Sequence, residues 1–365
     1  MDKVNILHIS PDFNYSCGVS KYVFLLLDEL SKREDLHLFF LTNKGDSLNR
    51  LNGLNVKINF LNFERGNKNP FKFILNYFLL KKFCTENRIE IIHTHHRYPE
   101  LLAYFVGKFL GIKTITTVHS LVDGWKYFSF KSDNIIAVSK AVERHLIEKY
   151  KVNKEKITQI YNFVKPFESP NYEEISNLKE KFGIKSDDKV LLFIGRIGYT
   201  KGCDILISAF EKLSNKYPSL RLLMIGNFES NELKESIMKN ERIIYLSPTN
   251  DIYKYYFLCD VVVLPSRIES LGYVMLEAGL AKKPFIGGKT GGIKEFIEDG
   301  TNGLLVNPGD VDNLVEKVEQ LLNDSNLSQM LGFNLFTKVS QLTNGDLYTN
   351  KLIELYSSLP NETVR

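Results

Sequence analysis

Short runs of apolar residues alternate with longer amphipathic stretches along most of the chain. The first run, at residues 4–9, predicts a strand, and residues 19–30 follow it with the period of a helix. The alternation predicts further strands in the first half at 36–41, 89–94, 113–119 and 135–138, and helices at 71–86, 100–110 and 141–150. Strands that alternate with helices are typical of parallel sheets built from βαβ units.

The alternation is interrupted between residues 161 and 170, where Pro166 and Pro170 predict a linker between two domains. After it, strands are predicted at 190–195, 220–225, 243–246, 261–264, 284–286 and 303–306, and helices at 204–212, 252–258, 273–280 and 311–322. We therefore expect two Rossmann-like, doubly wound α/β domains, at 1–165 and 166–345. Such folds bind ligands beyond the carboxyl ends of their strands, so the informative side chains should directly follow strands.

The composition is that of an ordinary globular protein, with 365 residues of which 44% are hydrophobic and 25% charged. The longest apolar runs fall well short of the ~18–20 residues that a membrane-spanning helix needs. The cysteines, Cys17, Cys84, Cys203 and Cys259, show no paired spacing and are expected to be reduced. Because the first residues predict a strand and not a signal peptide, we expect a cytoplasmic protein.

Charge is distributed unevenly, because residues 1–165 carry 25 Lys and Arg against 16 Asp and Glu, whereas residues 166–365 carry 22 against 27. A basic half indicates an anionic partner, either membrane lipid or nucleic acid, but we find no nucleic-acid recognition motif. Residues 65–83 interleave five basic residues with aromatic and aliphatic ones. Such a helix can lie on anionic lipid. A helix that packs on its own domain with a solvated basic face explains the pattern as well.

A glycine-rich loop follows the predicted strand at 190–195 and opens a helix. It carries Arg196 and Lys201 between Gly195 and Gly202. Glycines let the backbone approach a ligand closely, and a helix N-terminus offers unpaired N–H groups. The two cations suit an anionic diphosphate. The alternative is a solvated loop in which two basic residues occur by chance.

Two glutamates follow the predicted strand at 261–264. Glu269 falls in the loop and Glu277 about two turns into the next helix, so both carboxylates can approach one site and accept hydrogen bonds from sugar hydroxyls. A capping glutamate and a helix-surface glutamate are the simpler interpretation. A second glycine-rich loop, at 287–295, lacks the GxxxxGK[ST] arrangement of a P-loop.

Histidines cluster near the ends of predicted strands in the first half, at His93, His95, His96 and His119. Zinc binding is disfavoured, because no Cys or Glu follows at ligand spacing and because we expect His93 and His95 to point to opposite faces of their strand. His119 is either a polar-site residue or a core histidine. The loop that ends at Cys17 and Gly18 contains no GxGxxG, which argues against a nicotinamide-dependent dehydrogenase.

Together these segments resemble the group 1 retaining glycosyltransferases, family four of that enzyme class, over most of the chain. The strongest match is the pair Glu269 and Glu277, which fits the EX7E motif within a segment close to PSxxExxG. Arg196 and Lys201 lie in a match to the GRxxxxKG element. The remaining matches are GGxxE and DGxNGxLV at 291–306 and the motifs of the N-terminal domain at 92–96, 118–119 and 138–139.

The resemblance implies a GT-B fold, in which two Rossmann-like domains face each other across a cleft and a final helix, from residue 346 on, packs back on the N-terminal domain. The C-terminal domain would bind a nucleotide-sugar donor and the N-terminal domain the acceptor. The family retains anomeric configuration and needs neither a divalent metal nor another cofactor. The acceptor implied is a glycan or a lipid-linked molecule of cell-surface polysaccharide assembly, which would place the enzyme at the inner face of the membrane.

The same resemblance implies a role for each matching residue. Arg196 and Lys201 would neutralise the donor diphosphate as the sugar–phosphate bond breaks. Glu277 would bind the ribose hydroxyls, whereas Glu269 and His119 would contact the donor sugar. Further donor contacts would come from Gly18, Leu271, Gly272 and Tyr273, and weaker acceptor-side contacts from His95 and His96.

The chain departs from the family pattern in two places. Cys17 precedes Gly18 where the family often has a second glycine, and Ser270–Leu271 stands where it often has Pro-Phe, so sugar specificity is not carried over. Two alternatives remain open, a sugar-nucleotide epimerase of the same fold and a non-catalytic protein that binds nucleotide sugars. A phosphorylase of this fold would keep a cofactor lysine in a segment that we do not find.

Overall fold

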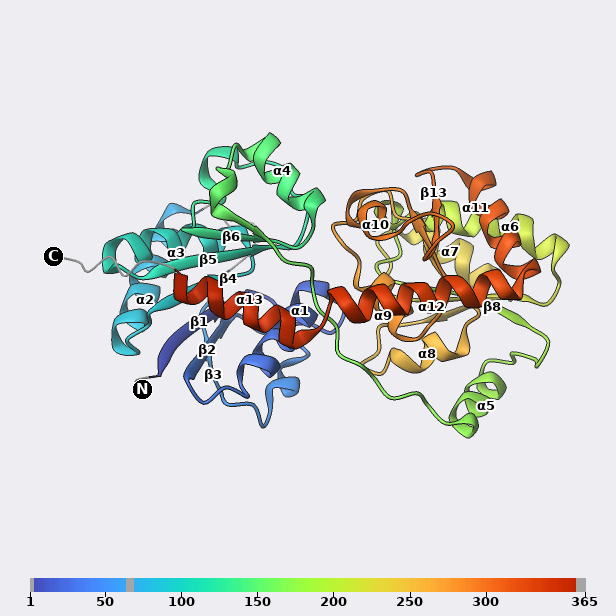
Figure 1. Cartoon of the computed structure of the whole chain (residues 1–365), viewed down its shortest axis with the longest axis horizontal. Helices are drawn as coiled ribbons and strands as arrows, with labels where there is room; N and C mark the ends of the chain where they lie inside the picture. The colour runs from blue at the N-terminus through green and yellow to red at the C-terminus, as the bar shows by residue number, and fades with distance from the viewer. Residues whose placement is uncertain (1–2, 64–68, 359–365) are drawn as a thin grey trace. The chain divides into compact units, whose positions relative to one another are not determined.

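The computed structural model describes residues 3–63 and 69–358 (Figure 1). The chain divides into two compact units, the first formed by residues up to Phe163 and again from Gly345, the second by Val164–Asn344. The sequence predicts these boundaries at 165/166 and 345/346. Within the described residues no helix is long and apolar enough to cross a membrane. All four cysteines are free thiols.

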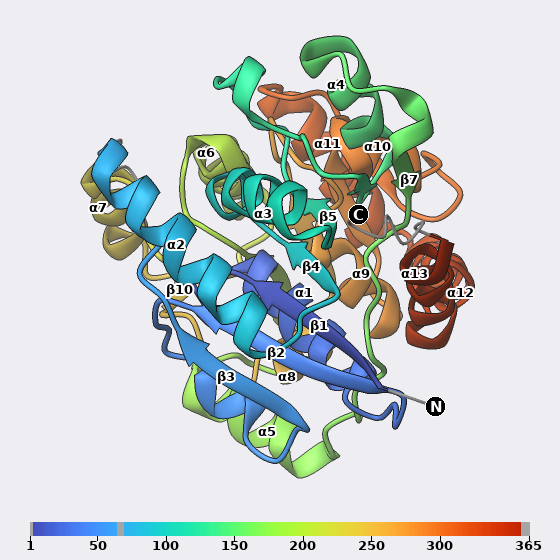
Figure 2. The same ribbon diagram turned by 90° about the vertical axis from the view of Figure 1, so that its left-hand side faces the viewer.

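The first unit is a parallel sheet of seven strands in the order β3-β2-β1-β4-β5-β6-β7. The strands are β1 (Val4–Ile9), β2 (Leu36–Thr42), β3 (Val56–Phe60), β4 (Ile91–Thr94), β5 (Lys113–Val118), β6 (Asn134–Ala137) and β7 (Ile157–Gln159). The α-helices are α1 (Gly18–Leu30), α2 (Pro70–Glu86), α3 (Arg97–Leu110), α4 (Lys140–Tyr150) and α13 (Gly345–Ser358). The C-terminal helix α13 packs on α1, whereas α2 and α3 lie side by side and contact each other (Figure 2).

The second unit is a parallel sheet of six strands in the order β10-β9-β8-β11-β12-β13. The strands are β8 (Lys189–Ile194), β9 (Leu220–Ile225), β10 (Ile243–Leu246), β11 (Val261–Leu264), β12 (Phe285–Gly288) and β13 (Leu304–Val306). The helices are α5 (Tyr172–Lys181), α6 (Cys203–Lys216), α7 (Asn231–Lys239), α8 (Tyr253–Leu258), α9 (Tyr273–Leu280), α10 (Gly291–Phe296), α11 (Val311–Asn323) and α12 (Ser325–Leu342).

The strand order reverses once in each sheet. In the first unit the chain runs outward from β1 to β3 and then returns to the other side of β1 with β4. In the second unit it runs outward from β8 to β10 and returns to the other side of β8 with β11. Loops that leave the carboxyl ends of strands at such a switch point diverge and form a ligand crevice. Each unit therefore has a candidate site of its own, at the loops after β1 and β4 in the first unit and after β8 and β11 in the second.

The central strands form because both of their faces are covered by helices. All four residues of β11 are buried, as are all of β8 after Lys189. Such strands have continuous apolar runs and are easily recognised in a sequence. Four elements that the sequence did not predict, β3, β7, α5 and α7, have little buried surface. Helix α5 has no buried residue, and α7 buries only Ile237. The helix α10 was also not predicted, because its segment was taken as a glycine-rich loop, and it buries Ile293 and Phe296.

Candidate functional site

Gly202 ends the loop after β8 and precedes α6. Its φ of 71° lies in the left-handed region, and a Cβ there would lie 2.1 Å from the carbonyl oxygen of Pro265. Only glycine fits this approach, so the loops after β8 and β11 pack backbone against backbone. The backbone N–H of Arg267 also donates to the carbonyl of Thr200 at 2.9 Å. The two loops at the switch point are thus joined directly.

The second glycine-rich loop packs against the same segment. Gly291 has a φ of 46°, and a Cβ on it would lie 1.7 Å from the carbonyl oxygen of Glu269. The N–H of Gly292 donates to that carbonyl at 3.1 Å, and a Cβ on Gly292 would lie 2.1 Å from the carbonyl oxygen of Ser270. The glycines of this loop therefore permit close packing around Glu269.

Lys201 and Glu269 form an ion pair that joins the loops after β8 and β11. Both side chains are largely buried, with exposed fractions of 18% and 13%. Removing charges from water is costly, and each charge is tolerated only while its partner is present. The pair places a cation and a carboxylate from distant parts of the chain together at the switch point.

Arg196 lies in the same loop as Lys201 but pairs with a different carboxylate. Its Nη1 donates to Oε1 of Glu229, beyond β9, at 2.7 Å. The arginine side chain is 61% exposed. An ion pair this exposed contributes little and is screened by salt. An anionic ligand could therefore displace Glu229 from Arg196 at little cost.

A second pair of side chains braces the two loops and was missed by the sequence analysis. Arg267 donates from Nη1 and Nη2 to the two carboxylate oxygens of Asp204, both at 2.7 Å, and its guanidinium stacks on the Tyr199 ring at 3.6 Å. Burial alone would raise the pKa of Asp204, but the hydrogen bonds and charge of Arg267 outweigh it and lower that pKa. The sequence signal was slight: an arginine two positions before Glu269.

Glu277 is buried in α9, with 2% of its surface exposed. The hydroxyl of Tyr256, in α8, donates to its Oε2 at 2.6 Å. Burial raises the pKa of Tyr256 well above its usual value, which keeps this donor protonated. Helix α9 begins only at Tyr273, so Glu277 lies about one turn into the helix and not two, as the sequence suggested.

The chain between Glu269 and α9 contains the three residues from which further donor contacts are predicted. Leu271 is buried, Gly272 precedes the helix with a φ of 89°, and Tyr273 is its first residue. A Cβ on Gly272 would lie 3.3 Å from Cγ of Glu269. Glycine therefore combines the left-handed turn with a close approach to the carboxylate side chain.

In the first unit the predicted residues gather after β1, β4 and β5. Gly18 begins α1, beyond the loop that follows β1. His96 precedes α3, with its Nδ1 3.5 Å from the hydroxyl of Ser10. His119 directly follows β5 and packs against the edge of the Tyr22 ring, with centroids 4.5 Å apart.

His95 is buried within a row of histidines. Its Nε2 lies 3.4 Å from Nδ1 of His8, and its Nδ1 lies 3.4 Å from Nε2 of His119. Burial lowers the pKa of His8 to about 3, and burial together with His96 lowers the pKa of His119 to about 3. The rings are therefore neutral near neutral pH. His8 was not singled out in the sequence because it lies inside the apolar strand β1.

The expectation that His93 and His95 point to opposite faces is wrong. Their ring centroids are 4.6 Å apart, because side chains two residues apart on a strand share a face. With His8, their nitrogens lie within 4.8 Å of one another, close enough to hold a metal ion. The two nitrogens of His93, however, each lie 2.7 Å from a hydroxyl, that of Tyr356 or that of Thr117. A metal ion at His93 would have to break one of these hydrogen bonds.

Comparison with known proteins agrees with this architecture. The structure of HepE from Anabaena, in complex with UDP and glucose, matches with a TM-score of 0.85 at 19% identity and covers 97% of this chain and 99% of HepE. WaaG, a glycosyltransferase of lipopolysaccharide biosynthesis, matches with a TM-score of 0.75 at 15% identity over 97% of this chain and 100% of WaaG. The expected GT-B fold of two Rossmann-like units is thereby confirmed.

Sequence comparison then gives the family. The model of the group 1 glycosyl transferases matches residues 174–335, and that of glycosyltransferase family 4 matches residues 17–166. N-acetyl-α-D-glucosaminyl L-malate synthase of Bacillus anthracis is 27% identical over 305 residues, 78% of each chain. CapM of Staphylococcus aureus, a glycosyltransferase of capsular polysaccharide biosynthesis, is 27% identical over 66% of this chain and 68% of CapM. The chain belongs to the group 1 glycosyltransferases.

Proposed function

We propose that this glycosyltransferase takes its sugar from a nucleotide-sugar donor bound at the loops after β8 and β11. The observation that carries the proposal is the Lys201–Glu269 pair at the switch point of the second unit. A nucleotide sugar offers a diphosphate to a cation and hydroxyls to a carboxylate. Two structures of the same fold contain UDP with glucose or UDP-glucose, which supports this class of donor.

Different residues then bind different parts of the nucleotide sugar. Lys201 and Arg196 neutralise the diphosphate, with Arg196 exchanging its exposed partner Glu229 for phosphate. Glu269 accepts hydrogen bonds from the donor sugar, and Glu277 accepts them from the ribose. The backbone at Leu271, Gly272 and Tyr273 adds donor contacts.

We propose that transfer retains the configuration at the anomeric carbon by attack on the face that the phosphate leaves. The acceptor hydroxyl oxygen bonds to the anomeric carbon while the bond from that carbon to the phosphate oxygen breaks. The hydroxyl proton passes to the departing phosphate oxygen, so no side chain has to act as a base. Negative charge that develops on the diphosphate is stabilised by Arg196 and Lys201, which take the place of a divalent metal.

The first unit would bind the acceptor. We propose a glycan or lipid-linked acceptor of cell-surface polysaccharide assembly, by likeness to CapM, and a cytoplasmic enzyme that works at the inner face of the membrane. His119 and Gly18 would approach the donor from this unit, and His96 would lie on the acceptor side. His95, also predicted there, is buried with both ring nitrogens against other histidines, so it would act behind His119 and would not touch the acceptor.

Anomeric ¹H NMR during turnover tests the proposal. The protein is incubated with UDP, GDP, ADP and CMP sugars in the presence of EDTA, with water as the default acceptor. We expect one donor to be consumed, with release of its nucleotide and first appearance of the sugar in the donor's own anomeric configuration. Lys201→Met should slow the reaction about 10²–10³-fold, whereas Lys216→Met, in a pair with Glu319 on the same unit, should not.

Each contrary result identifies another function. First appearance of the opposite anomer contradicts retention, and loss of turnover in EDTA contradicts metal independence. Conversion of the donor sugar to its epimer would identify an epimerase. A donor that binds and is not consumed with any saccharide acceptor would identify a non-catalytic binding protein.

A further inference from the structure

Helices α2 and α3 present an unusual number of large apolar side chains to solvent. In α2 only Asn76, Leu80 and Cys84 are buried. The exposed apolar residues are Phe71, Ile74, Leu75, Phe78 and Leu79 on α2 and Phe105 and Phe109 on α3. Phe71 is 80% exposed and Phe109 59% exposed. A contiguous apolar face of this kind marks a surface that is covered in function.

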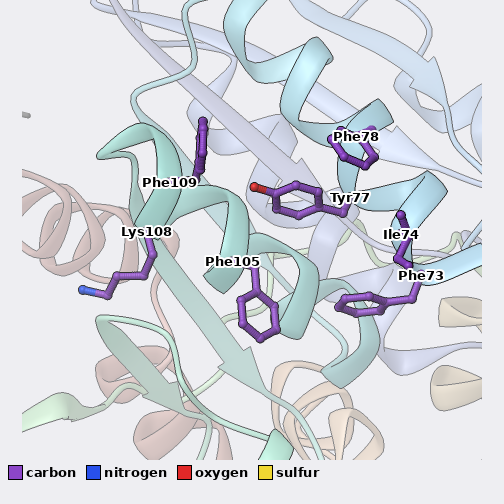
Figure 3. Close-up of a pocket in the computed structure, with 7 residues that line it drawn as sticks. All are labelled: Phe73, Ile74, Tyr77, Phe78, Phe105, Lys108 and Phe109. Atoms are coloured by element: carbon purple, nitrogen blue, oxygen red, sulfur yellow. The ribbon is translucent and has the colours of Figure 1, made fainter. Parts of the chain in front are cut away.

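An open groove of about 590 Å³ also lies between the two helices. Its lining is Phe73, Ile74, Tyr77, Phe78, Phe105, Lys108 and Phe109 (Figure 3). Lys108 is the one charged residue in this lining, and its ammonium group points away from the aromatic rings (Figure 3). The groove is thus apolar within, and the one cation at its margin lies 3.8 Å from Oδ1 of Asp133 in a partly exposed pair.

Both helices also carry lysines. Lys72, Lys81 and Lys82 belong to α2, whose only acidic residue is Glu86, and Lys108 belongs to α3. The ammonium of Lys81 lies 3.7 Å from the centroid of the Phe109 ring. Lys82 and Glu86 are 3.7 Å apart and both exposed, so that pair holds Lys82 only weakly. Long lysine side chains can keep their charge in water while their stems cover apolar surface.

We propose that this aromatic face of α2 and α3 docks on an anionic lipid bilayer. Phe71, Phe78 and Phe109 would enter the boundary between headgroups and acyl chains, and the lysines would lie against lipid phosphates. An anionic bilayer has negatively charged phosphates at its surface and apolar acyl chains beneath them, which would contact the lysines and the aromatic rings respectively. A second copy of the chain would bring the same lysines against each other, which disfavours self-association.

The structure changes the surface that the sequence predicted. The predicted segment was 65–83, of which Arg65 and Lys68 lie outside the described residues. The structure adds three residues of α3, Phe105, Lys108 and Phe109, which contact the face from another part of the chain. The docking proposal is argued from exposed apolar and basic side chains, and it does not depend on the proposed donor site.

Vesicle sedimentation tests the docking face. The full chain is mixed with phosphatidylcholine vesicles with or without phosphatidylglycerol, at low and high salt. We expect sedimentation only with the anionic vesicles, and less of it at high salt, because salt screens exposed charges. Lys82→Gln should lower the partition coefficient about fivefold, and Phe78→Ser and Phe109→Ser about tenfold each.

Matched controls come from the second unit. Lys239 forms an exposed i,i+4 pair with Glu235 like that of Lys82 with Glu86, and Phe333 is 57% exposed. Lys239→Gln and Phe333→Ser should leave sedimentation unchanged. Absence of binding at low salt, or equal losses in the control variants, would overturn the proposal. Lipid-free dimerisation that Phe78→Ser abolishes would also overturn it, by identifying a second copy as the occupant.

A separate observation concerns the row of histidines His8, His95 and His119. A neutral imidazole has one N–H donor and one acceptor nitrogen, so the hydrogen bonds along the row must all run in one direction. The Nε2 of His8, at the buried end, has no hydrogen-bond partner among the described residues. For backbone groups, a buried N–H without a partner is rarer than a buried C=O that lacks one, and we extend this preference to the ring nitrogens. We therefore assign Nε2 of His8 as the nitrogen without a proton and Nδ1 as its N–H donor.

We infer that His8 and His95 are positioning residues that hold His119 as its Nδ1–H tautomer. His8 donates from Nδ1 to Nε2 of His95, and His95 donates from Nδ1 to Nε2 of His119. His119 then presents an N–H donor on the other side of its ring. In the proposed function this N–H would donate a hydrogen bond to a sugar oxygen, which an unprotonated ring nitrogen could not do.

Tautomer-resolved ¹⁵N NMR of histidine-labelled protein tests this inference without a ligand. We expect His119 to carry its proton on Nδ1, the less common tautomer of free histidine. A His119 that carries it on Nε2 would overturn the inference and leave the donor-site proposal untouched. His8→Phe should return His119 to a mixture of tautomers, whereas His37→Phe, at an exposed hydrogen bond to Asn5, should not.

Discussion

At the scale of single residues, Lys201 and Glu269 depend on each other, because both are largely buried. Lys201→Met leaves a carboxylate without its cation, and we expect it to lower the free energy of unfolding by about 1–3 kcal/mol. Lys201→Met with Glu269→Gln should recover most of that loss, while kcat/KM stays about 10²–10³-fold below wild type. Thermal unfolding and initial rates measure the two effects. Activity that returns together with stability would contradict a role for Lys201 in transfer.

Glu277 allows a substitution that separates charge from packing. Glu277→Gln keeps an oxygen that can accept from Tyr256, so the thermal midpoint should change little. Hydrogen bonds to a charged group are worth about 1.5–3 kcal/mol, so nucleotide affinity should fall about 10- to 100-fold. Titration calorimetry measures the affinity. Unchanged affinity in a folded variant would show that Glu277 has only a structural role.

The Asp204–Arg267 pair predicts a dependence of stability on pH. Because Arg267 lowers the pKa of Asp204 in the folded chain, the pair contributes stability above the unfolded pKa, about 4. That contribution is lost as pH falls through the lower, folded pKa. The difference in unfolding midpoint between wild type and Asp204→Asn should therefore be present at neutral pH and shrink in acid. A difference that is constant with pH would contradict the pairing.

At the scale of elements, the close packing of the loops after β8 and β11 can be tested at Gly202. Gly202→Ala suffers both a φ of 71° and a Cβ 2.1 Å from the carbonyl oxygen of Pro265. Gly183→Ala has a similar φ of 62° but nothing within 4 Å of its Cβ. It should therefore lower the free energy of unfolding only by the cost of a left-handed alanine backbone, about 1–2 kcal/mol. Gly202→Ala should lose more stability and most activity, as measured by unfolding and by initial rates. Equal effects would mean that the loops move apart freely.

The sequence predicted best those elements whose own residues are apolar enough to require burial. Val261–Leu264 is apolar throughout, and it becomes a strand buried on both faces. Helix α5 could not be predicted in the same way, because none of its residues is buried and a capping box at Asn171 begins it. Local polar chemistry of that kind gives no periodic signal.

At the scale of the whole molecule, the order of strands decides which residues meet. The sequence indicated Arg196, Lys201, Glu269 and Glu277 because each follows a strand. It could not indicate that Arg196 pairs with Glu229 while Lys201 pairs with Glu269, since those contacts depend on which strands are neighbours. His8 was invisible for the same reason, since it acquires a polar neighbour only when β4 pairs with β1.

The account as a whole depends on a nucleotide site in the second unit. Titration calorimetry of the wild-type chain with UDP, GDP, ADP and CMP, in EDTA and then in magnesium, tests it most directly. We predict that one nucleotide binds in the micromolar range with an affinity that does not change when magnesium replaces EDTA. Binding that requires magnesium would contradict the role given to Arg196 and Lys201. Absence of binding by every nucleotide would contradict the donor site itself.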